Sequence, residues 1–198
     1  MVTFEESNLK FTFPDSAAAV KYDDTRFYRN YVNQLPGAKG MDFVSLWENS
    51  VVFTEVKNCE GEEADNRWRI YPDNEKLTTT ASKNNTAGRD SLDIEVARKA
   101  ALTVAGLYGA YTKKSGCESA AELENLARSL WKKRDITDRS PLLIILFLEG
   151  DFGCESRSKK MVMSALENKI KKKLSWLDCQ VSVVDSDTYR KEIFSVQK

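Results

Sequence analysis

The sequence contains no histidine, and this absence removes several classes of active site at once. Ser-His-Asp and Cys-His nucleophilic sites need a histidine base, and His-ligated zinc centres need its ring nitrogens. Histidine is also the residue that most readily exchanges protons near neutral pH. An enzyme with this sequence must therefore use carboxylates, lysines, hydroxyl groups or a cofactor.

Two other kinds of motif are missing. No GxxxxGK[ST] loop and no GxGxxG element is present, so nucleotide-binding folds of those types have no support. Cysteines occur only at Cys59, Cys117, Cys154 and Cys179, without any CxxC pair. Such wide spacing predicts free, buried thiols rather than a disulfide framework.

The sequence also lacks a net charge and a long apolar run. Its 30 basic and 30 acidic residues balance, so no global basic field attracts nucleic acid. The densest apolar run, "PLLIILFL", is too short to span a bilayer, and the first ten residues carry acids where a signal peptide carries basic residues. We expect a cytoplasmic protein with no membrane partner, folded as one domain over residues 1–198.

Hydrophobic periodicity predicts a mixed α/β fold with helices on both faces of a central sheet. A long polar loop is expected over residues 59–89, with a short strand at 67–71 as one option. Strands are predicted at 8–14, 40–47, 50–58, 141–150 and 179–185, and helices at 23–35, 90–113, 118–133, 158–177 and 186–196.

Three charged residues interrupt the apolar hairpin "GMDFVSLWENSVVFTEVKN". Side chains alternate along a strand, so Glu55 and Lys57 point to one face while Val56 points into the core. The turn at 48–50 folds Asp42 back toward Glu55. Charges in such surroundings are costly unless they are paired or bind a metal. The alternative is an exposed edge hairpin with a surface Glu–Lys pair, but the β-branched and aromatic neighbours favour a central strand.

This charge cluster suits phosphodiester hydrolysis. Two carboxylates offer hard oxygen ligands to Mg²⁺, which prefers a few carboxylates together with water and phosphate. The metal acidifies a water molecule and offsets charge on the phosphodiester, while a lysine positions the water or stabilises the developing charge. No histidine is needed for this chemistry.

The pattern Met41-Asp42 followed by Glu55-Val56-Lys57 resembles the motif of the PD-(D/E)xK nuclease superfamily, with Met41 in place of proline. The wider sequence also resembles a bacterial group of nuclease-fold proteins without assigned function. The resemblance implies a restriction endonuclease-like fold and a Mg²⁺- or Mn²⁺-dependent hydrolase that cleaves DNA. Asp42 and Glu55 would bind the metal, and both would act with Lys57 as catalytic residues. A homodimer would fit an enzyme that cuts two strands.

The resemblance also implies helper residues outside the hairpin. Asp24, or its neighbour Asp23, could add a metal ligand, although either could simply cap a helix. The polar side of the helix at 90–113 could reach the site through Glu95, Arg98 and Lys99. The alternative is a solvated helix face with a Glu95–Lys99 pair. The long loop mixes basic and aromatic residues around Arg67 and Arg69, which suits stacking on single strands or flexed duplex. The expected nucleic-acid contacts are Arg67, Arg69, Arg98 and Lys99.

A second function remains open at this stage. The same fold can lose its cleavage activity and act as a nucleic-acid- or protein-binding regulatory module, because fold does not fix function. The lack of a strong basic field favours this alternative, whereas the complete Asp-Glu-Lys pattern favours the nuclease.

Overall fold

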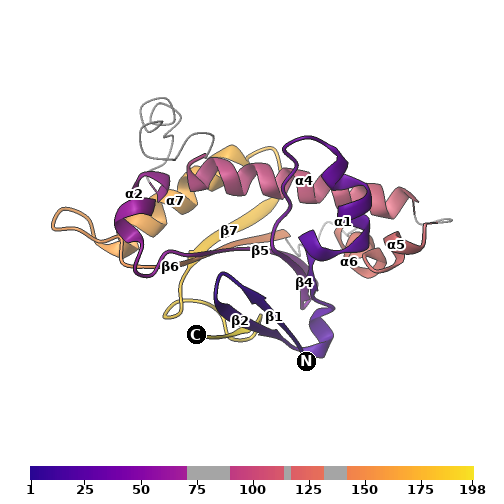
Figure 1. Ribbon diagram of the computed structural model, residues 1–198, viewed down its shortest axis with the longest axis horizontal. Coiled ribbons are helices and arrows are strands. Elements are labelled where there is room, and N and C mark those ends of the chain that lie inside the picture. The colour runs from indigo at the N-terminus through magenta and orange to yellow at the C-terminus, as the bar shows by residue number, and fades with distance from the viewer. Residues whose placement is uncertain (71–89, 114–116, 132–141) are drawn as a thin grey trace.

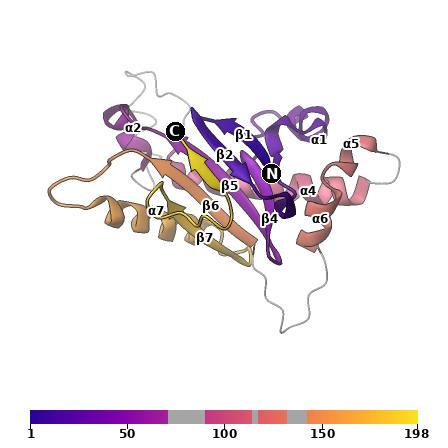
Figure 2. The same cartoon turned by 90° about the horizontal axis from the view of Figure 1, so that it is seen from below.

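The computed structural model describes residues 1–70, 90–113, 117–131 and 142–198. Two β-sheets and a layer of helices make up these residues, as an α/β fold (Figure 1). Both chain termini lie at the smaller sheet (Figures 1 and 2). Within the described residues, no helix combines the length and apolar character that a bilayer crossing requires.

Among the described residues, the larger sheet has five strands in the order β3-β4-β5-β6-β7. Strand β5 lies at its centre, antiparallel to β4 and parallel to β6, which in turn runs parallel to β7. The predicted hairpin is therefore present, and its second strand is buried between neighbours rather than exposed at an edge. The strands span Val20–Lys21 (β3), Phe43–Trp47 (β4), Ser50–Asn58 (β5), Leu142–Glu149 (β6) and Cys179–Val184 (β7).

One face of this sheet is covered by helices. Helices α4 and α7 lie along it, with α1, α5 and α6 toward one end and α2 toward the other (Figure 1). Inward residues of the sheet, such as Val51, Phe53 and Leu146, share one core with the apolar sides of these helices. The helices span Arg26–Asn30 (α1), Glu63–Ile70 (α2), Leu92–Lys113 (α4), Glu118–Ala121 (α5), Glu124–Trp131 (α6) and Lys159–Lys173 (α7).

The opposite face is covered by a second sheet, where the sequence predicted helices. Strands β1 (Val2–Glu6), β2 (Leu9–Phe13) and β8 (Ser195–Gln197) form it in the order β1-β2-β8. Phe11, Phe13 and Phe194 pack there against Phe43 and Phe147 of the larger sheet. The prediction of helices on both faces was wrong because a cluster of aromatic side chains from both ends of the chain covers this face.

Several predicted elements differ in the structure. The C-terminal residues 186–196 were predicted as a helix; they form turns and part of β8, because Ile193 and Phe194 are buried against the sheets. The strand option at 67–71 was wrong, since 63–70 is helix α2, with acids in its first turn and arginines in its last. The remainder of the expected loop, 71–89, lies outside the described residues.

The predicted helix at 23–35 is broken into three short pieces. A 3-10 turn at Tyr22–Asp24 is followed by α1 and by a second 3-10 turn at Val32–Gln34. All four cysteines are free as predicted, although only Cys59 is buried.

Tyr22 packs between helix α4 and the segment that precedes β4. Its ring is fully buried, and the space for it exists because Gly40 and Gly106 have no side chains. A Cβ at Gly40 would lie 2.6 Å from the ring, and one at Gly106 would overlap its hydroxyl group. The Tyr22 backbone N–H also donates to the carbonyl of Asp42 at 2.9 Å. The segment that carries Asp42 is thereby held against α4.

We expect Gly106→Ala to destabilise the protein by about 1–3 kcal/mol, because the added methyl group must displace the buried Tyr22 ring. Gly109→Ala is the matched control in the same helix, where the new Cβ would lie 3.6 Å from Phe27, an ordinary contact. That control should be neutral or stabilising by up to about 1 kcal/mol through helix propensity. Urea denaturation measures both changes, and equal effects would contradict the packing described for Tyr22.

Candidate functional site

The structure brings Asp42, Glu55 and Lys57 together on the helix-covered face of the large sheet. Asp42 immediately precedes β4, whose Phe43 pairs with Thr54, so continuing the register places Asp42 opposite Glu55. Its Oδ2 accepts a hydrogen bond from the Val56 N–H at 2.7 Å. Lys57 follows two residues after Glu55 on the same face, and its Nζ lies 2.7 Å from Glu55 Oε1.

Lys99 of helix α4 completes this cluster from above the sheet. Its ammonium donates to both carboxylate oxygens of Glu55, at 2.6 and 2.8 Å, and to Asp42 Oδ1 at 3.3 Å. Glu55 has no exposed surface, and Lys99 is 8% exposed. A cation therefore lies between the two carboxylates, and here it belongs to a lysine of the chain.

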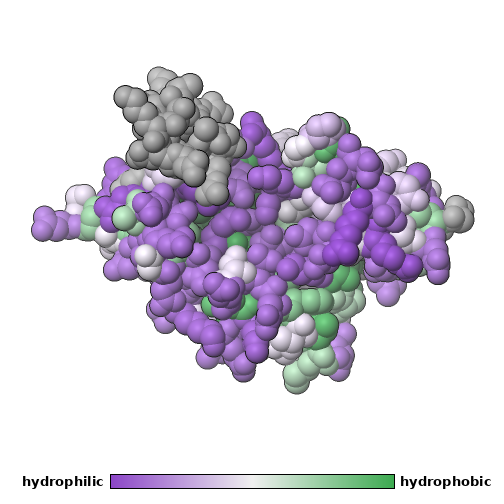
Figure 3. All heavy atoms as spheres, in the orientation of Figure 1, coloured by the Kyte–Doolittle hydropathy of each residue, from purple (hydrophilic) through white to green (hydrophobic). Residues whose placement is uncertain are grey.

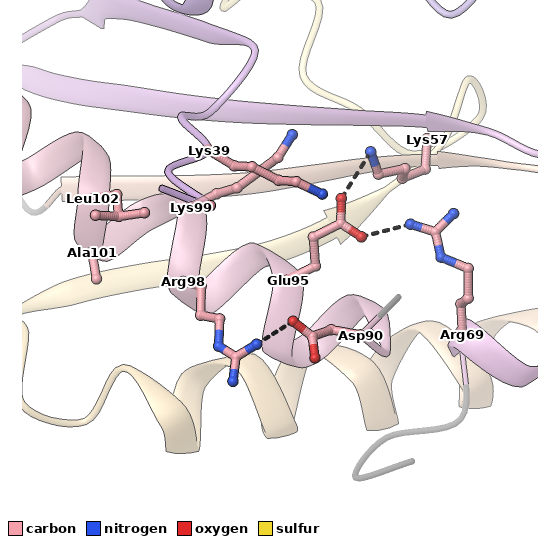
Figure 4. A pocket seen from close by; sticks show the side chains of 10 residues that line it. Lys39, Lys57, Arg69, Asp90, Glu95, Arg98, Lys99, Ala101 and Leu102 are labelled. Atoms are coloured by element: carbon pink, nitrogen blue, oxygen red, sulfur yellow. Dashed lines mark hydrogen bonds and ion pairs between the residues drawn. The ribbon is translucent and has the colours of Figure 1, made fainter. Parts of the chain in front are cut away.

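The charges continue outward to the surface through Glu95 and Arg69. Glu95 Oε1 lies 3.3 Å from Lys57 Nζ, and its Oε2 lies 2.6 Å from an Arg69 guanidinium nitrogen (Figure 4). Glu95 thus pairs with residues of β5 and α2 rather than with Lys99 one turn along its own helix, which was the structural alternative. Three acids and three bases alternate in one connected network.

The pKa values of this network reflect burial opposed by ion pairing. Burial raises the pKa of Glu55, and repulsion from Asp42 raises it further, to about 7, against the attraction of Lys99 and Lys57. For Lys57 and Lys99, burial alone would lower the pKa, but the carboxylate of Glu55 outweighs it and the pKa of both is raised. Both lysines are therefore protonated at neutral pH and act as hydrogen-bond donors.

The structure separates the two candidate acids of the N-terminal region. Asp24 is exposed by about half and pairs with Arg29 and Lys21. Asp23 faces the cluster: its Oδ1 is buried and has no hydrogen-bond partner among the described residues. Burial, and then repulsion from Asp42, raise the pKa of Asp23. Neither acid caps helix α1, because Thr25 does so by accepting from the Tyr28 N–H.

A pocket of about 740 Å³ opens above the buried acids. Of the predicted nucleic-acid contacts, Arg69 and Arg98 line it, whereas Arg67 is exposed on α2 and is not among its described lining residues. Lys99 lines it as well, although its ammonium is committed to the acids below. The side of the molecule drawn in Figure 3 is mostly hydrophilic. The full set of described lining residues is Gly37, Lys39, Lys57, Arg69, Asp90, Glu95, Arg98, Lys99, Ala101 and Leu102.

Sequence reasoning missed Lys39 as part of this site. Lys39 lies in the loop that leads to β4, two residues before the first residue of the Met41-Asp42 … Glu55-Val56-Lys57 motif. A usable signal was its position as the one charged residue of the segment "PGAKGM". Glu95 was among the polar residues of this helix expected to reach the site, and it lines the pocket and pairs with Lys57 and Arg69.

The carboxylate oxygens of this site are of the type that binds a divalent cation, but too few of them converge to complete a metal site. Asp42 and Glu55 provide hard carboxylate oxygens that converge on one position, which Lys99 Nζ holds. The unpartnered Asp23 Oδ1 is a further buried carboxylate oxygen. Across the described parts of the chain, no three acidic, cysteine or histidine residues lie close enough to hold a metal. A cation at this position requires Lys99 to withdraw its ammonium.

We expect Lys99→Met to cost roughly 3–5 kcal/mol of folding stability near neutral pH, because it leaves two buried carboxylates facing each other. The pKa of Glu55 in the folded variant should rise further above its unfolded value. The contribution of protonated Glu55 to folding stability is then fully present below its unfolded pKa of about 4.5. It is lost as the pH rises from there through the folded pKa, by up to about 1.4 kcal/mol per pH unit.

Denaturant titrations at pH 5, 7 and 8.5 measure this pH dependence. Arg98→Met, one residue earlier on an exposed position, should change stability by less than about 0.5 kcal/mol. Adding Glu55→Gln to Lys99→Met should remove the pH dependence. A pH-independent loss in Lys99→Met would show that the methylene stem of Lys99, rather than its charge, stabilises the fold.

Comparisons with known proteins give a family but no function. No curated protein and no solved structure matches the chain. One family model, described as a family of unknown function (DUF6661), matches residues 25–198. The match covers helix α1, the hairpin with Asp42, Glu55 and Lys57, and helix α4. The chain therefore belongs to the DUF6661 family of unknown function.

Proposed function

We propose that this protein is a divalent-metal-dependent nuclease that hydrolyses phosphodiester bonds, with DNA as the expected substrate and Mg²⁺ or Mn²⁺ as cofactor. One observation carries the proposal: the carboxylates of Asp42 and Glu55 converge on a single cation position beneath a pocket lined by positive charge. Buried acids below and basic side chains above match a metal bound under a phosphodiester.

Each acid has a distinct role in this proposal. Asp42 is oriented by the hydrogen bond from the Val56 N–H to Oδ2, which leaves Oδ1 directed at the cation position. Glu55 presents both oxygens to that position, and its Oε1 also contacts Lys57. When bound there, Mg²⁺ supplies a Lewis acid that offsets phosphodiester charge and makes water a better nucleophile.

Lys57 acts as a charged donor and not as a base. Its pKa is raised, so it keeps its proton at neutral pH and can hold a water molecule or a phosphate oxygen. Glu95 accepts from Lys57 and from Arg69, which fixes where the Lys57 ammonium lies. Glu95 is therefore a positioning residue for Lys57.

A binding module without cleavage is the second candidate, and the position of Lys99 favours it. The three acids and three bases of the network neutralise one another without any metal. In this alternative, the ammonium of Lys99 permanently occupies the position of the metal cation, and the pocket binds its ligand without hydrolysing it.

We expect purified protein to cleave nucleic acid with Mg²⁺ or Mn²⁺ and not with EDTA. Asp42→Asn should abolish both the Mn²⁺-dependent shift in melting temperature and cleavage, because it removes a negative ligand. Lys57→Met should keep the shift but lose about 100-fold or more in rate, since it removes only the donor to water or phosphate. Gel assays on single- and double-stranded DNA and RNA, with thermal melts, measure these effects.

Asp24→Asn serves as the matched control, since this acid lies outside the cluster and pairs with Arg29 and Lys21. It should cleave like the unmodified protein. Cleavage that survives Asp42→Asn would point to a contaminating nuclease. Absence of both a metal-dependent shift and cleavage in the unmodified protein would favour the binding module.

A further inference from the structure

Lys39 is the one exposed residue in an otherwise buried segment. Ala38 and residues Gly40 to Val44 are all buried, whereas Lys39 is exposed and lines the pocket above the cation position. The backbone around it is fixed on both sides. The Tyr28 hydroxyl donates to the Ala38 carbonyl and accepts from the Gly40 N–H, both at 3.2 Å.

The next residue fixes this segment to helix α4 as well. The Met41 N–H donates to the hydroxyl of Thr103 at 2.9 Å. Gly40 itself cannot carry a side chain without displacing the Tyr22 ring. The segment is thus held rigidly, and Lys39 projects from it into the pocket beside Lys99 (Figure 4).

Lys39 also differs from the other cations of the pocket, because no acidic residue in the described part of the chain pairs with it. Lys57 and Arg69 pair with Glu95, Lys99 with Glu55 and Asp42, and Arg98 with Asp90. Among the described residues, no carboxylate lies within ion-pair distance of Lys39. Its charge is therefore available to an anion that enters the pocket.

The pocket combines this free cation with an apolar side. Ala101 and Leu102 of α4 line the part away from the Glu95 pairs (Figure 4). A volume of about 740 Å³ is in the range of sites that enclose a small organic molecule. A flat surface would suit the backbone of a duplex, whereas a pocket of this kind suits one nucleotide taken out of a stack.

We propose that this pocket binds one unstacked nucleotide of a single-stranded nucleic acid, with its phosphate on Lys39 and its sugar and base against Ala101 and Leu102. The inference rests on the proposed function in taking the bound anion to be a phosphodiester. It adds a substrate class, single strands, and a phosphate-binding residue outside the hairpin motif. Lys57 lies on the same pocket and directs the strand toward the buried acids.

The test is binding of a fluorescent single-stranded DNA 12-mer, measured by anisotropy in EDTA, where no cleavage can occur. At about 0.1 M salt, Lys39→Gln should weaken binding roughly three- to tenfold and reduce the slope of log K against log salt by about 0.7, the value for one lost phosphate contact. Lys191→Gln, in the turn before β8 on the side of the smaller sheet, is the matched control and should change neither quantity.

Three competitors identify the source of the phosphate. An unlabelled single strand should compete at least tenfold better than a duplex of the same length, and better than a mononucleotide or inorganic phosphate. Equal competition by the duplex would overturn the single-strand assignment. Equal competition by a mononucleotide would overturn the assignment to a strand, and equal affinities of Lys39→Gln and Lys191→Gln would overturn the role of Lys39.

Failure of this inference can be told apart from failure of the proposed function. If strand binding depends on Lys39 but the protein shows no metal-dependent cleavage, the nucleotide-binding role of the pocket is supported and the nuclease function is contradicted. If cleavage depends on Asp42 but Lys39→Gln and the unmodified protein have the same KM for single strands, the nuclease function is supported. The nucleotide-binding role of the pocket is then contradicted.

Discussion

The ion pair between Glu55 and Lys99 is the interaction on which the rest of the structure depends. Glu55 lies at the centre of the large sheet with no exposed surface, where an isolated carboxylate would be too costly to ionise. Lys99 approaches from helix α4 and donates to both of its oxygens. The position of α4 over the sheet and the charge state of the site are therefore set by the same contact.

The packing that holds helix α4 against the sheet depends on glycine residues that leave room for a neighbouring ring. Gly106 leaves room for the Tyr22 ring, and Tyr22 in turn contacts Gly40 and the carbonyl of Asp42. A shift of α4 would move Lys99 away from the acids and would also close the space for this ring. Folding stability and the geometry of the site are thus coupled. The position of Lys99 relative to the acids is held by a core that tolerates little change in volume.

The sequence by itself determined the hairpin, the central position of its second strand and the face shared by Glu55 and Lys57. These features follow from local rules, since side chains alternate along a strand and apolar neighbours demand burial. The strands and helices from residue 90 onward were also predictable to within a few residues, apart from the C-terminal helix. The order of charges along the hairpin was enough to indicate a cluster with Asp42.

Only the tertiary structure decided which residues complete that cluster. Lys99, Glu95 and Asp23 come from other elements, and their approach depends on how α4 and the N-terminal turn pack, which no local pattern encodes. The smaller sheet was missed for the same reason, because its strands come from opposite ends of the chain. Helix α2 and the exposure of Lys39 likewise depend on contacts between distant segments, where burial and charge pairing outweigh local propensity.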